Sequence, residues 1–596
     1  MKKLTWPILT MISMIVLSIS LLSINLSYAY TSGHIGLLTV SESDNSTIEK
    51  GGVADLSLVI KPGTGRIFID SFPLSKLDTQ ITMRFATEVA CDLLDKDCSG
   101  YDFFYTITAN SALVGGPSAG AAATVLTVGL LDNQILDNNT VMTGTINSGN
   151  LIGPVAGVPA KAKAAQERGY TRVLTPEWDI VNNTPDKNLS IQVIPVSTLE
   201  DALFYFTGKN YTVDYSAGEP TNMDLVSSKD YIDIMGKVTL DLCGRYGDIV
   251  NGTLVLPNLT AYGINVSNAT QNNFVLALAA INNKSYYSAA SFCFGGNVKL
   301  RAKLTENLSR DDLKILYAKL LGNISDFENK LGQTSKSIAT ISELESYMIV
   351  KERLSDAKTA LSGMNPENIS SYQLAYATER FDTAVVWSRF SKLPGQKFIM
   401  DNDLLKVVCT KKLSEAEERL NYLELYYPSG DIRGELADAY DYYNEGDYVL
   451  CIFTASKTKA DTDVVLSAIF VPDTNTGKLL DEKIDAARRV IAKQEKADIF
   501  PILGYSYYEY ANTLKNTDKY SALLYAEYSL ELSNLDMYFK KHDSSPLSFV
   551  GNSFIQTNMY VFLLGLFIGI LITTIVSIIL YRSLHRSMNK GKKKKR

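Results

Sequence analysis

Histidine is scarce in this chain of 596 residues. Only His34, His542 and His585 occur, and none of them lies beside a serine or cysteine motif. A Ser-His-Asp or Cys-His hydrolase is therefore disfavoured, because both need an imidazole as the general base. The same shortage leaves no histidine cluster that could bind zinc, and no metal site is expected.

Nucleotide and calcium motifs are also missing. The sequence contains no G-x-x-x-x-G-K-[ST] segment, so no P-loop, no bound ATP and no other cofactor is expected. Residues 95–100 begin like a calcium-binding loop, but Thr106 stands at the twelfth position, where such a loop carries a bidentate glutamate. We interpret this segment as an acidic turn.

Positive charge is scarce between the two ends of the chain. Without Lys2, Lys3 and the eight basic residues after Tyr581, 48 Lys and Arg residues face 64 Asp and Glu residues, a net charge of about −16. Such a surface repels phosphate backbones, so nucleic acid is excluded as a partner. The negative charge favours solubility outside the cell.

The N-terminus has the pattern of a secretory signal. Lys2 and Lys3 precede an apolar run, and Ser27-Tyr28-Ala29 places small residues where a signal peptidase cleaves. We expect residues 1–29 to be a signal peptide. An uncleaved N-terminal anchor is the alternative, because the apolar run is long.

The C-terminus predicts a membrane anchor. Residues 559–581 carry no charge, and their number suffices to cross the hydrocarbon core as a helix. Residues 582–596 contain eight basic residues and no acid, which places this tail in the cytoplasm. We therefore expect a single-pass protein of the cell membrane, with the lipid bilayer as one partner and everything between the two apolar segments outside.

Two further features are typical of an extracytoplasmic protein. Glycosylation sequons recur along the chain, and the six cysteines fall into three neighbouring pairs. The sequons begin at Asn45, Asn138, Asn182, Asn188, Asn210, Asn251, Asn258, Asn265, Asn268, Asn283, Asn307, Asn323 and Asn368. The disulfide candidates are Cys91 with Cys98, Cys243 with Cys293, and Cys409 with Cys451. Buried free thiols are the alternative.

Hydrophobic periodicity divides the part between the apolar segments in two. Residues 34–208 alternate short strand-like runs with helical ones, including helices at 81–94, 119–131 and 160–168, and predict an α+β domain. Residues 223–545 predict an all-helical domain. Three stretches in it, 276–302, 435–460 and 505–532, each read as two helices around a turn, and they resemble degenerate tetratricopeptide repeats.

One segment stands out as a candidate nucleophile site. In Gly115-Gly116-Pro117-Ser118-Ala119-Gly120, a serine lies on a tight turn between a predicted strand and a small-residue helix. Backbone N–H groups near Gly116, Pro117 and Ala119, at the start of a helix, are suited to bind an oxyanion. By itself the segment also fits a simple turn with a helix cap.

Two later segments make the pattern specific. Residues 142–144 read Met-Thr-Gly, and residues 153–165 form a Gly-rich turn that opens a helix with Lys161. Together with Ser118 they resemble the proteolytic domain of Lon-type serine proteases, peptidase family S16, over about residues 34–206. The resemblance implies that Ser118 is the nucleophile, Lys161 its general base 43 residues later, and Thr143 a residue that positions the pair.

A lysine acts as a base only when it is neutral. We therefore expect burial to depress the pKa of Lys161, and no acid lies between Thr140 and Gln166 to stabilise its ammonium form. Lys163 is the rival base, but it points about 200° away on the same helix. The alternative to a catalytic base is that Lys161 and Lys163 are both solvated surface lysines.

The chain also departs from the family. Lon proteases commonly have an acidic residue where this chain has Gly115, a Glu where it has Thr145 and a Lys where it has Pro159. The sequence also contains no ATPase motif. It thus resembles the ATP-independent archaeal forms, which implies an endopeptidase for unfolded or flexible extracytoplasmic proteins. A catalytically inactive surface scaffold and a self-cleaving protein are the alternatives. Members of the family assemble into rings, so a homo-oligomer is allowed but not decided.

Overall fold

The computed structural model describes residues 30–40, 50–180, 189–212, 228–250, 268–334 and 338–541, apart from 366 and 392, together with single positions between 565 and 582. Residues 1–541 form one compact unit, and residues 542–596 form another. Among the described residues, no helix is long and apolar enough to cross a membrane. The expected signal peptide and most of the expected membrane segment at 559–581 lie outside the described residues.

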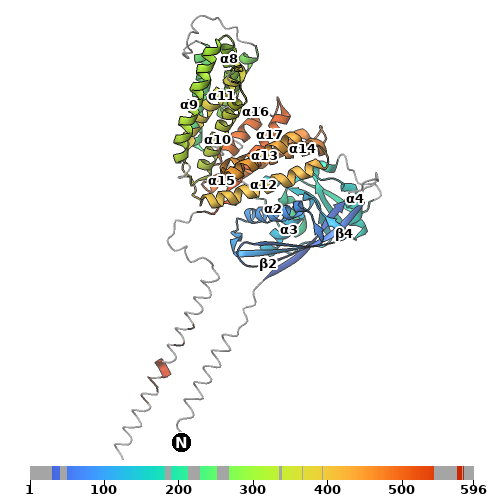
Figure 1. Ribbon diagram of the computed structural model, residues 1–596. Helices are drawn as coiled ribbons and strands as arrows, with labels where there is room; N and C mark the ends of the chain where they lie inside the picture. Colours follow the sequence, from blue (N-terminus) through green and yellow to red (C-terminus); the bar gives the residue numbers. More distant parts are fainter. Residues whose placement is uncertain are drawn as a thin grey trace, which may run out of the picture. The chain divides into compact units, whose positions relative to one another are not determined.

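A seven-stranded mixed sheet forms the centre of the first domain (Figure 1). Its order is β3-β4-β2-β1-β5-β8-β9, in which β2 runs antiparallel to both β1 and β4, and the remaining neighbours are parallel. The strands are β1 (Thr31–Val40), β2 (Gly51–Pro62), β3 (Ile67–Ser75), β4 (Tyr101–Val114), β5 (Thr140–Met142), β8 (Arg172–Pro176) and β9 (Gln192–Val196).

One face of this sheet packs against α2 and α3, and α4 covers the other face over β1, β2 and β8. Leu37 and Leu174 belong to the core beneath the helices α2 and α3, whereas their neighbours Leu38 and Val173 belong to the core beneath α4. The helices of this domain are α2 (Leu77–Leu93), α3 (Gly120–Leu131), α4 (Val158–Glu167) and α5 (Leu199–Thr207). The expected mixed α/β domain is confirmed.

A small hairpin projects from this domain toward the helical one. Its strands are β6 (Thr145–Ile146) and β7 (Ile152–Gly153), joined by a single 3₁₀ turn at Ser148–Asn150. The tip enters the helical domain: a Cβ added at Gly149 would lie 2.6 Å from Leu530 Cδ2. The hairpin comes directly after Thr143 and Gly144, so its contacts with the helical domain help to position the candidate site.

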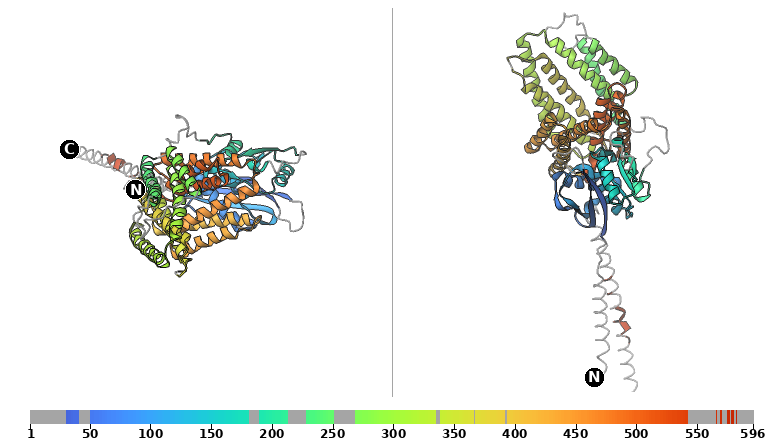
Figure 2. Two further views of the ribbon diagram at one scale, coloured as in Figure 1. Left: turned by 90° about the horizontal axis from the view of Figure 1, so that it is seen from above. Right: turned by 90° about the vertical axis from the view of Figure 1, so that its right-hand side faces the viewer.

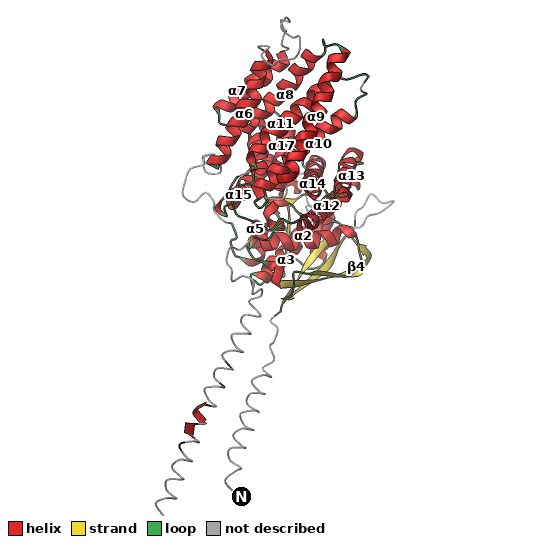
Figure 3. Cartoon of the chain, turned by 60° about the vertical axis from the view of Figure 1, so that its left-hand side comes forward, coloured by secondary structure: helices red, strands yellow, loops and turns green. Residues whose placement is uncertain are grey.

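Between Lys229 and Ser533, every described element of secondary structure longer than one turn is an α-helix (Figure 3). This confirms the expected all-helical region. The helices are α6 (Lys229–Val250), α7 (Asn268–Asn282), α8 (Tyr286–Thr305), α9 (Arg310–Thr334), α10 (Ile341–Ser362), α11 (Ser371–Trp387), α12 (Asn402–Glu424), α13 (Gly430–Glu445), α14 (Tyr448–Phe470), α15 (Thr476–Lys496), α16 (Ile502–Leu514) and α17 (Lys519–Ser533).

The three look-alike stretches each fold as two packed helices around a short turn, α7–α8, α13–α14 and α16–α17. The helices α12, α14, α15 and α17 lie against the α/β domain, whereas α8, α9 and α11 lie far from it (Figures 1 and 2). The structure joins the six cysteines as Cys91–Cys98, Cys243–Cys293 and Cys409–Cys451. The last of these links α12 to α14 beside the domain contact.

Candidate active site

The candidate nucleophile lies on a tight turn between β4 and α3. Gly116 has φ of 107°, a conformation that side-chain-bearing residues rarely adopt, and the 3₁₀ turn Pro117–Ala119 follows it. The Gly116 N–H donates a hydrogen bond to Asp78 Oδ2 at 2.9 Å, from the first turn of α2. Asp78 thus fixes the backbone just ahead of Ser118, whose side chain is partly exposed.

The Met-Thr-Gly segment is bonded directly to this turn. The backbone carbonyl of Ser118 accepts a hydrogen bond from the Gly144 N–H at 3.0 Å, and the Thr143 hydroxyl lies 3.5 Å from the same oxygen. In return the Gly144 carbonyl accepts from the Ala121 N–H at 3.1 Å. Two segments some 25 residues apart in sequence are thereby held in a fixed mutual position.

Lys161 is bonded to the Met-Thr-Gly segment through Thr143. Gly157 in the left-handed conformation starts α4, and Lys161 stands in its first turns with 2% of its surface exposed. The Lys161 amine donates to the hydroxyl of the fully buried Thr143, at 3.1 Å. The rival Lys163 is exposed. The structure therefore brings together Ser118, Thr143 and Lys161 through the threonine.

The turn offers fewer oxyanion donors than its glycines suggest. The Gly116 N–H is already donated to Asp78, and proline has no N–H. The backbone donors that remain on the turn are the N–H groups of Ser118 and Ala119, at the start of α3. Among the described residues, no group of three or more His, Cys, Asp or Glu side chains is placed to hold a metal.

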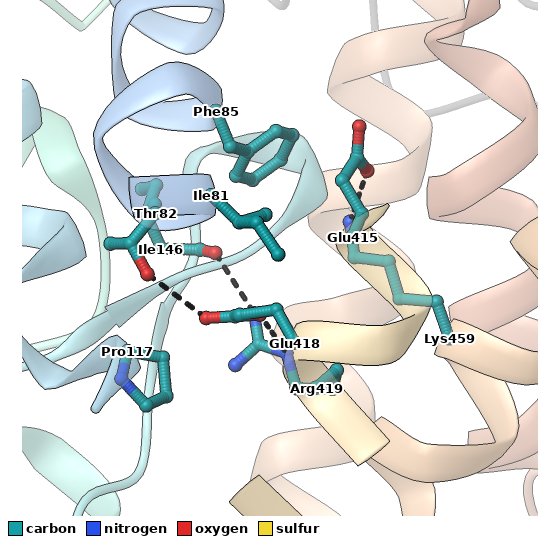
Figure 4. A pocket seen from close by; sticks show the side chains of 9 residues that line it. All are labelled: Ile81, Thr82, Phe85, Pro117, Ile146, Glu415, Glu418, Arg419 and Lys459. Atoms are coloured by element: carbon teal, nitrogen blue, oxygen red, sulfur yellow. Dashed lines mark hydrogen bonds and ion pairs between the residues drawn. The ribbon is translucent and has the colours of Figure 1, made fainter. Parts of the chain in front are cut away.

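The helical domain reaches the edge of this site through α12 (Figure 4). The Thr82 hydroxyl, on α2, donates to Glu418 Oε1 at 3.0 Å. The Arg419 guanidinium donates to the Ile146 carbonyl at 3.1 Å and to Asn147 Oδ1 at 2.8 Å, both on the hairpin. Burial raises the pKa of Glu418 to about 6, although Arg419 and the Thr82 hydrogen bond act to lower it.

Behind these contacts lies a buried cluster of paired charges. Its members are Lys412, Glu415, Arg419, Lys459, Asp463, Lys483, Glu527 and Glu531. Burial acts to raise the pKa of Glu531, but Lys412 and Lys459 outweigh it and lower this pKa to about 2. Glu531 also accepts from the hydroxyl of Ser148 at 2.7 Å, so the cluster binds the hairpin tip.

Sequence reasoning missed Asp78, Glu418 and Arg419. Asp78 carries a local signal, because an acid in the first turn of a helix commonly bonds nearby N–H groups. Glu418 and Arg419 carry none. They lie in the charged run Glu415–Arg419 of an amphipathic helix, which reads as a solvated face, and Thr82 is 336 residues from Glu418.

Part of the chain is similar in sequence to known proteins. Residues 107–206 match the family described as Lon protease (S16) C-terminal proteolytic domain. The archaeal Lon protease of Thermoplasma acidophilum is 32% identical over 114 residues, 19% of this chain and 17% of that protein. The archaeal Lon protease of Thermoplasma volcanium is 28% identical over 179 residues, 29% of this chain and 27% of that protein.

A eukaryotic relative matches the same way. The peroxisomal Lon protease homolog 2 of Xenopus laevis is 29% identical over 143 residues, 23% of this chain and 15% of that protein. The chain thus matches no more than 27% of the length of any of these three relatives. Residues 107–206, which contain Ser118, Thr143 and Lys161, are thus similar to the proteolytic domain of Lon-type serine proteases.

Proposed function

We propose that the protein is a serine endopeptidase in which Ser118 is the nucleophile and Lys161 the general base. One observation carries the proposal: a buried lysine amine donates to the Thr143 hydroxyl, which belongs to the segment bonded to the backbone of Ser118. A buried amine beside a neutral hydroxyl acts as a base only in its uncharged form, and burial is the condition that favours that form.

The chemistry follows from these positions. Neutral Lys161 takes the proton of the Ser118 hydroxyl, and the oxygen attacks the carbonyl carbon of a peptide bond. The N–H groups of Ser118 and Ala119 stabilise the negative charge that develops on the carbonyl oxygen. Lys161 then protonates the leaving amine, and water hydrolyses the acyl-enzyme with the same lysine as base. Thr143 holds the amine in place throughout.

We propose that the enzyme works without ATP, outside the cell membrane. The chain contains no P-loop motif that could supply an unfolding motor, so its substrates are chains that are already unfolded or flexible. Three disulfides are typical of an oxidising compartment, and the charge-free segment 559–581 with its basic flank fits a membrane anchor. The paired helices fit a role in recruiting such chains.

The test compares the purified protein with Ser118→Ala, Lys161→Ala and Lys163→Ala on an unfolded, casein-like substrate. Ser118→Ala reduces cleavage to background and Lys161→Ala lowers it by about 100-fold or more, the usual contribution of a general base. Lys163→Ala is the matched control from the same helix and keeps wild-type activity. The wild-type rate rises toward alkaline pH as the amine loses its proton.

Equal cleavage by the wild type and Ser118→Ala across the pH range would refute the proposal and leave a binding scaffold. Loss of activity in Lys163→Ala but not in Lys161→Ala would assign the base to the other lysine. Mass spectrometry of the products separates cleavage of added substrate from self-cleavage.

A further inference from the structure

A third contact of α12 with the α/β domain lies at the turn that leads into α4. The hydroxyl of Tyr422 accepts a hydrogen bond from the Ala156 N–H at 3.3 Å. Tyr422 follows Glu418 by four residues, so both side chains project from the same face of α12. Through this face the helical domain contacts α2, the β6–β7 hairpin and the segment that precedes the lysine helix.

Ala156 stands where the turn becomes a helix. The next residue, Gly157, has φ of 70° and forms the N-terminal cap of α4. Its carbonyl accepts the hydrogen bond of the Lys161 N–H at 3.0 Å. Because glycine adopts many backbone conformations readily, the direction in which α4 leaves this turn depends on what holds the neighbouring residues. The bond from Tyr422 holds the N–H immediately ahead of the glycine.

Tyr422 is itself firmly placed. Its side chain is buried, and its ring centre lies 5.4 Å from that of Tyr426 and 6.3 Å from that of Phe470, at the end of α14. One turn earlier, the Arg419 guanidinium is bonded to the hairpin and paired with Asp463. A hydroxyl on a ring that is packed in this way has little freedom to move, so it provides a fixed point for the turn.

The position of the candidate base depends on where α4 starts. Lys161 lies in the first turns of this helix, and its amine donates to the Thr143 hydroxyl at 3.1 Å. A general base has to stay within hydrogen-bond reach of the proton it takes, and a productive site holds its groups to within about 0.5 Å. A displacement of the helix start moves the amine with it, so the hold on the turn bears directly on the base.

We propose that Tyr422, contributed by the helical domain, is a positioning residue of the active site. Its hydroxyl holds the turn before α4 so that the Lys161 amine stays within reach of Thr143 and of the Ser118 hydroxyl. The inference rests on the proposed peptidase function. Tyr422 acts through the backbone of the turn, so its loss alters the placement of the base and leaves substrate binding unchanged. The helical domain thereby takes part in the catalytic geometry.

The test uses the full-length protein with Tyr422→Phe, which removes the hydroxyl and keeps the ring in its packing. The matched control is Tyr442→Phe, which removes a hydroxyl that lies 2.7 Å from Ser355 Oγ within the helical domain. A quenched fluorescent peptide, copied from a cut site mapped in unfolded casein, gives kcat and KM across the pH range in which lysine titrates. Ser118→Ala sets the background, and a melting curve checks the fold of each variant.

We expect Tyr422→Phe to lower kcat by about tenfold at an unchanged KM, less than the roughly 100-fold loss that a misplacement of about 1 Å can cause. A looser turn also lets water reach the amine, so the ammonium form is disfavoured less and the rate reaches its plateau at a higher pH, by about half a unit. Tyr442→Phe keeps the wild-type kcat, KM and pH profile. A role in stability alone would lower Tm without changing the pH profile of the folded enzyme.

The outcomes separate this inference from the function on which it rests. Wild-type cleavage no higher than that of Ser118→Ala would overturn both. An active wild type together with a Tyr422→Phe variant that keeps the wild-type kcat and pH profile, or that fails to fold, would overturn the positioning role alone and make Tyr422 a plain domain contact. A raised KM at an unchanged kcat would also overturn it, because the hydroxyl would then act on substrate binding.

Discussion

Arg419 offers the sharpest test of how the helical domain supports the site. Its side chain is 3% exposed and joins α12 to the hairpin that follows Thr143. Arg419→Met keeps much of the length but removes the guanidinium. It leaves the Ile146 carbonyl without this donor and weakens the compensation of the buried Asp463. Removing one partner of a buried ion pair costs about 3–5 kcal/mol.

This cost translates into a measurable melting shift. A folded unit of about 500 residues gains roughly 1 kcal/mol/K of unfolding entropy, so the loss lowers Tm by about 3–5 °C if the unit melts as one. Differential scanning calorimetry measures it. The matched control is Arg433→Met, which breaks pairs with Glu417 and Glu424 on the surface and shifts Tm by about 1 °C or less.

The double variant Arg419→Met with Asp463→Leu tests the cause. Replacing both partners of a buried pair by apolar groups restores part of the lost stability, because no charge is left uncompensated. Peptidase activity of Arg419→Met should also fall below that of Arg433→Met at a temperature where both are folded. Equal Tm values for the two single variants, or a double variant that is worse by the sum of both losses, would refute this account of the domain contact.

Three further predictions concern single buried groups. Thr143→Val removes the hydroxyl that accepts from Lys161 and should lower kcat by about tenfold, equivalent to about 1.4 kcal/mol, while Thr143→Ser retains activity; steady-state kinetics decides. Gly144→Ala should abolish activity and lower Tm, because the new Cβ would lie 2.4 Å from Ile152 Cγ2; a variant with wild-type Tm would contradict the crowding. Burial raises the pKa of Glu509 from 4.5 to about 7. Between these pH values the folded state keeps a proton that the unfolded state releases. The free energy of unfolding therefore falls by up to about 3 kcal/mol as the pH rises from about 4.5 to 7. Urea titrations of Glu509→Gln should show a flatter pH dependence than the wild type.

Much of the α/β domain could be predicted because its strands and helices are long enough to show a period. The helix expected at 81–94 is α2, and it begins earlier, at Leu77, because Asp78 supports its first turn. The strands β5, β6 and β7 have only two or three residues each, too few for an alternating pattern. The helix α5 was not predicted, although Thr198 and Asp201 form a capping box, a pattern that indicates a helix N-terminus.

The candidate site also contains some residues that the sequence predicts and others that it does not. Ser118, Thr143 and Lys161 belong to one stretch of sequence whose order and spacing resemble a known family, so the residues alone suffice to propose them as a group. The contact of Glu418 with Thr82 could not be proposed in this way, because it forms only through the packing of two domains. A charged residue on a helix gives no indication in a single sequence of which distant surface it will cover.

The seating of the β6–β7 hairpin has a consequence for the size of what can be cut. Leu151 and Trp178 of the α/β domain belong to the same buried apolar cluster as the helical domain. Swinging the two domains apart would expose this surface, so hinge opening is unfavourable. Under the proposed peptidase function, a polypeptide would therefore have to reach Ser118 while the two domains stay packed together. The rate at which a target protein is degraded would be governed by how often that target unfolds locally, and ligands that rigidify the target would protect it.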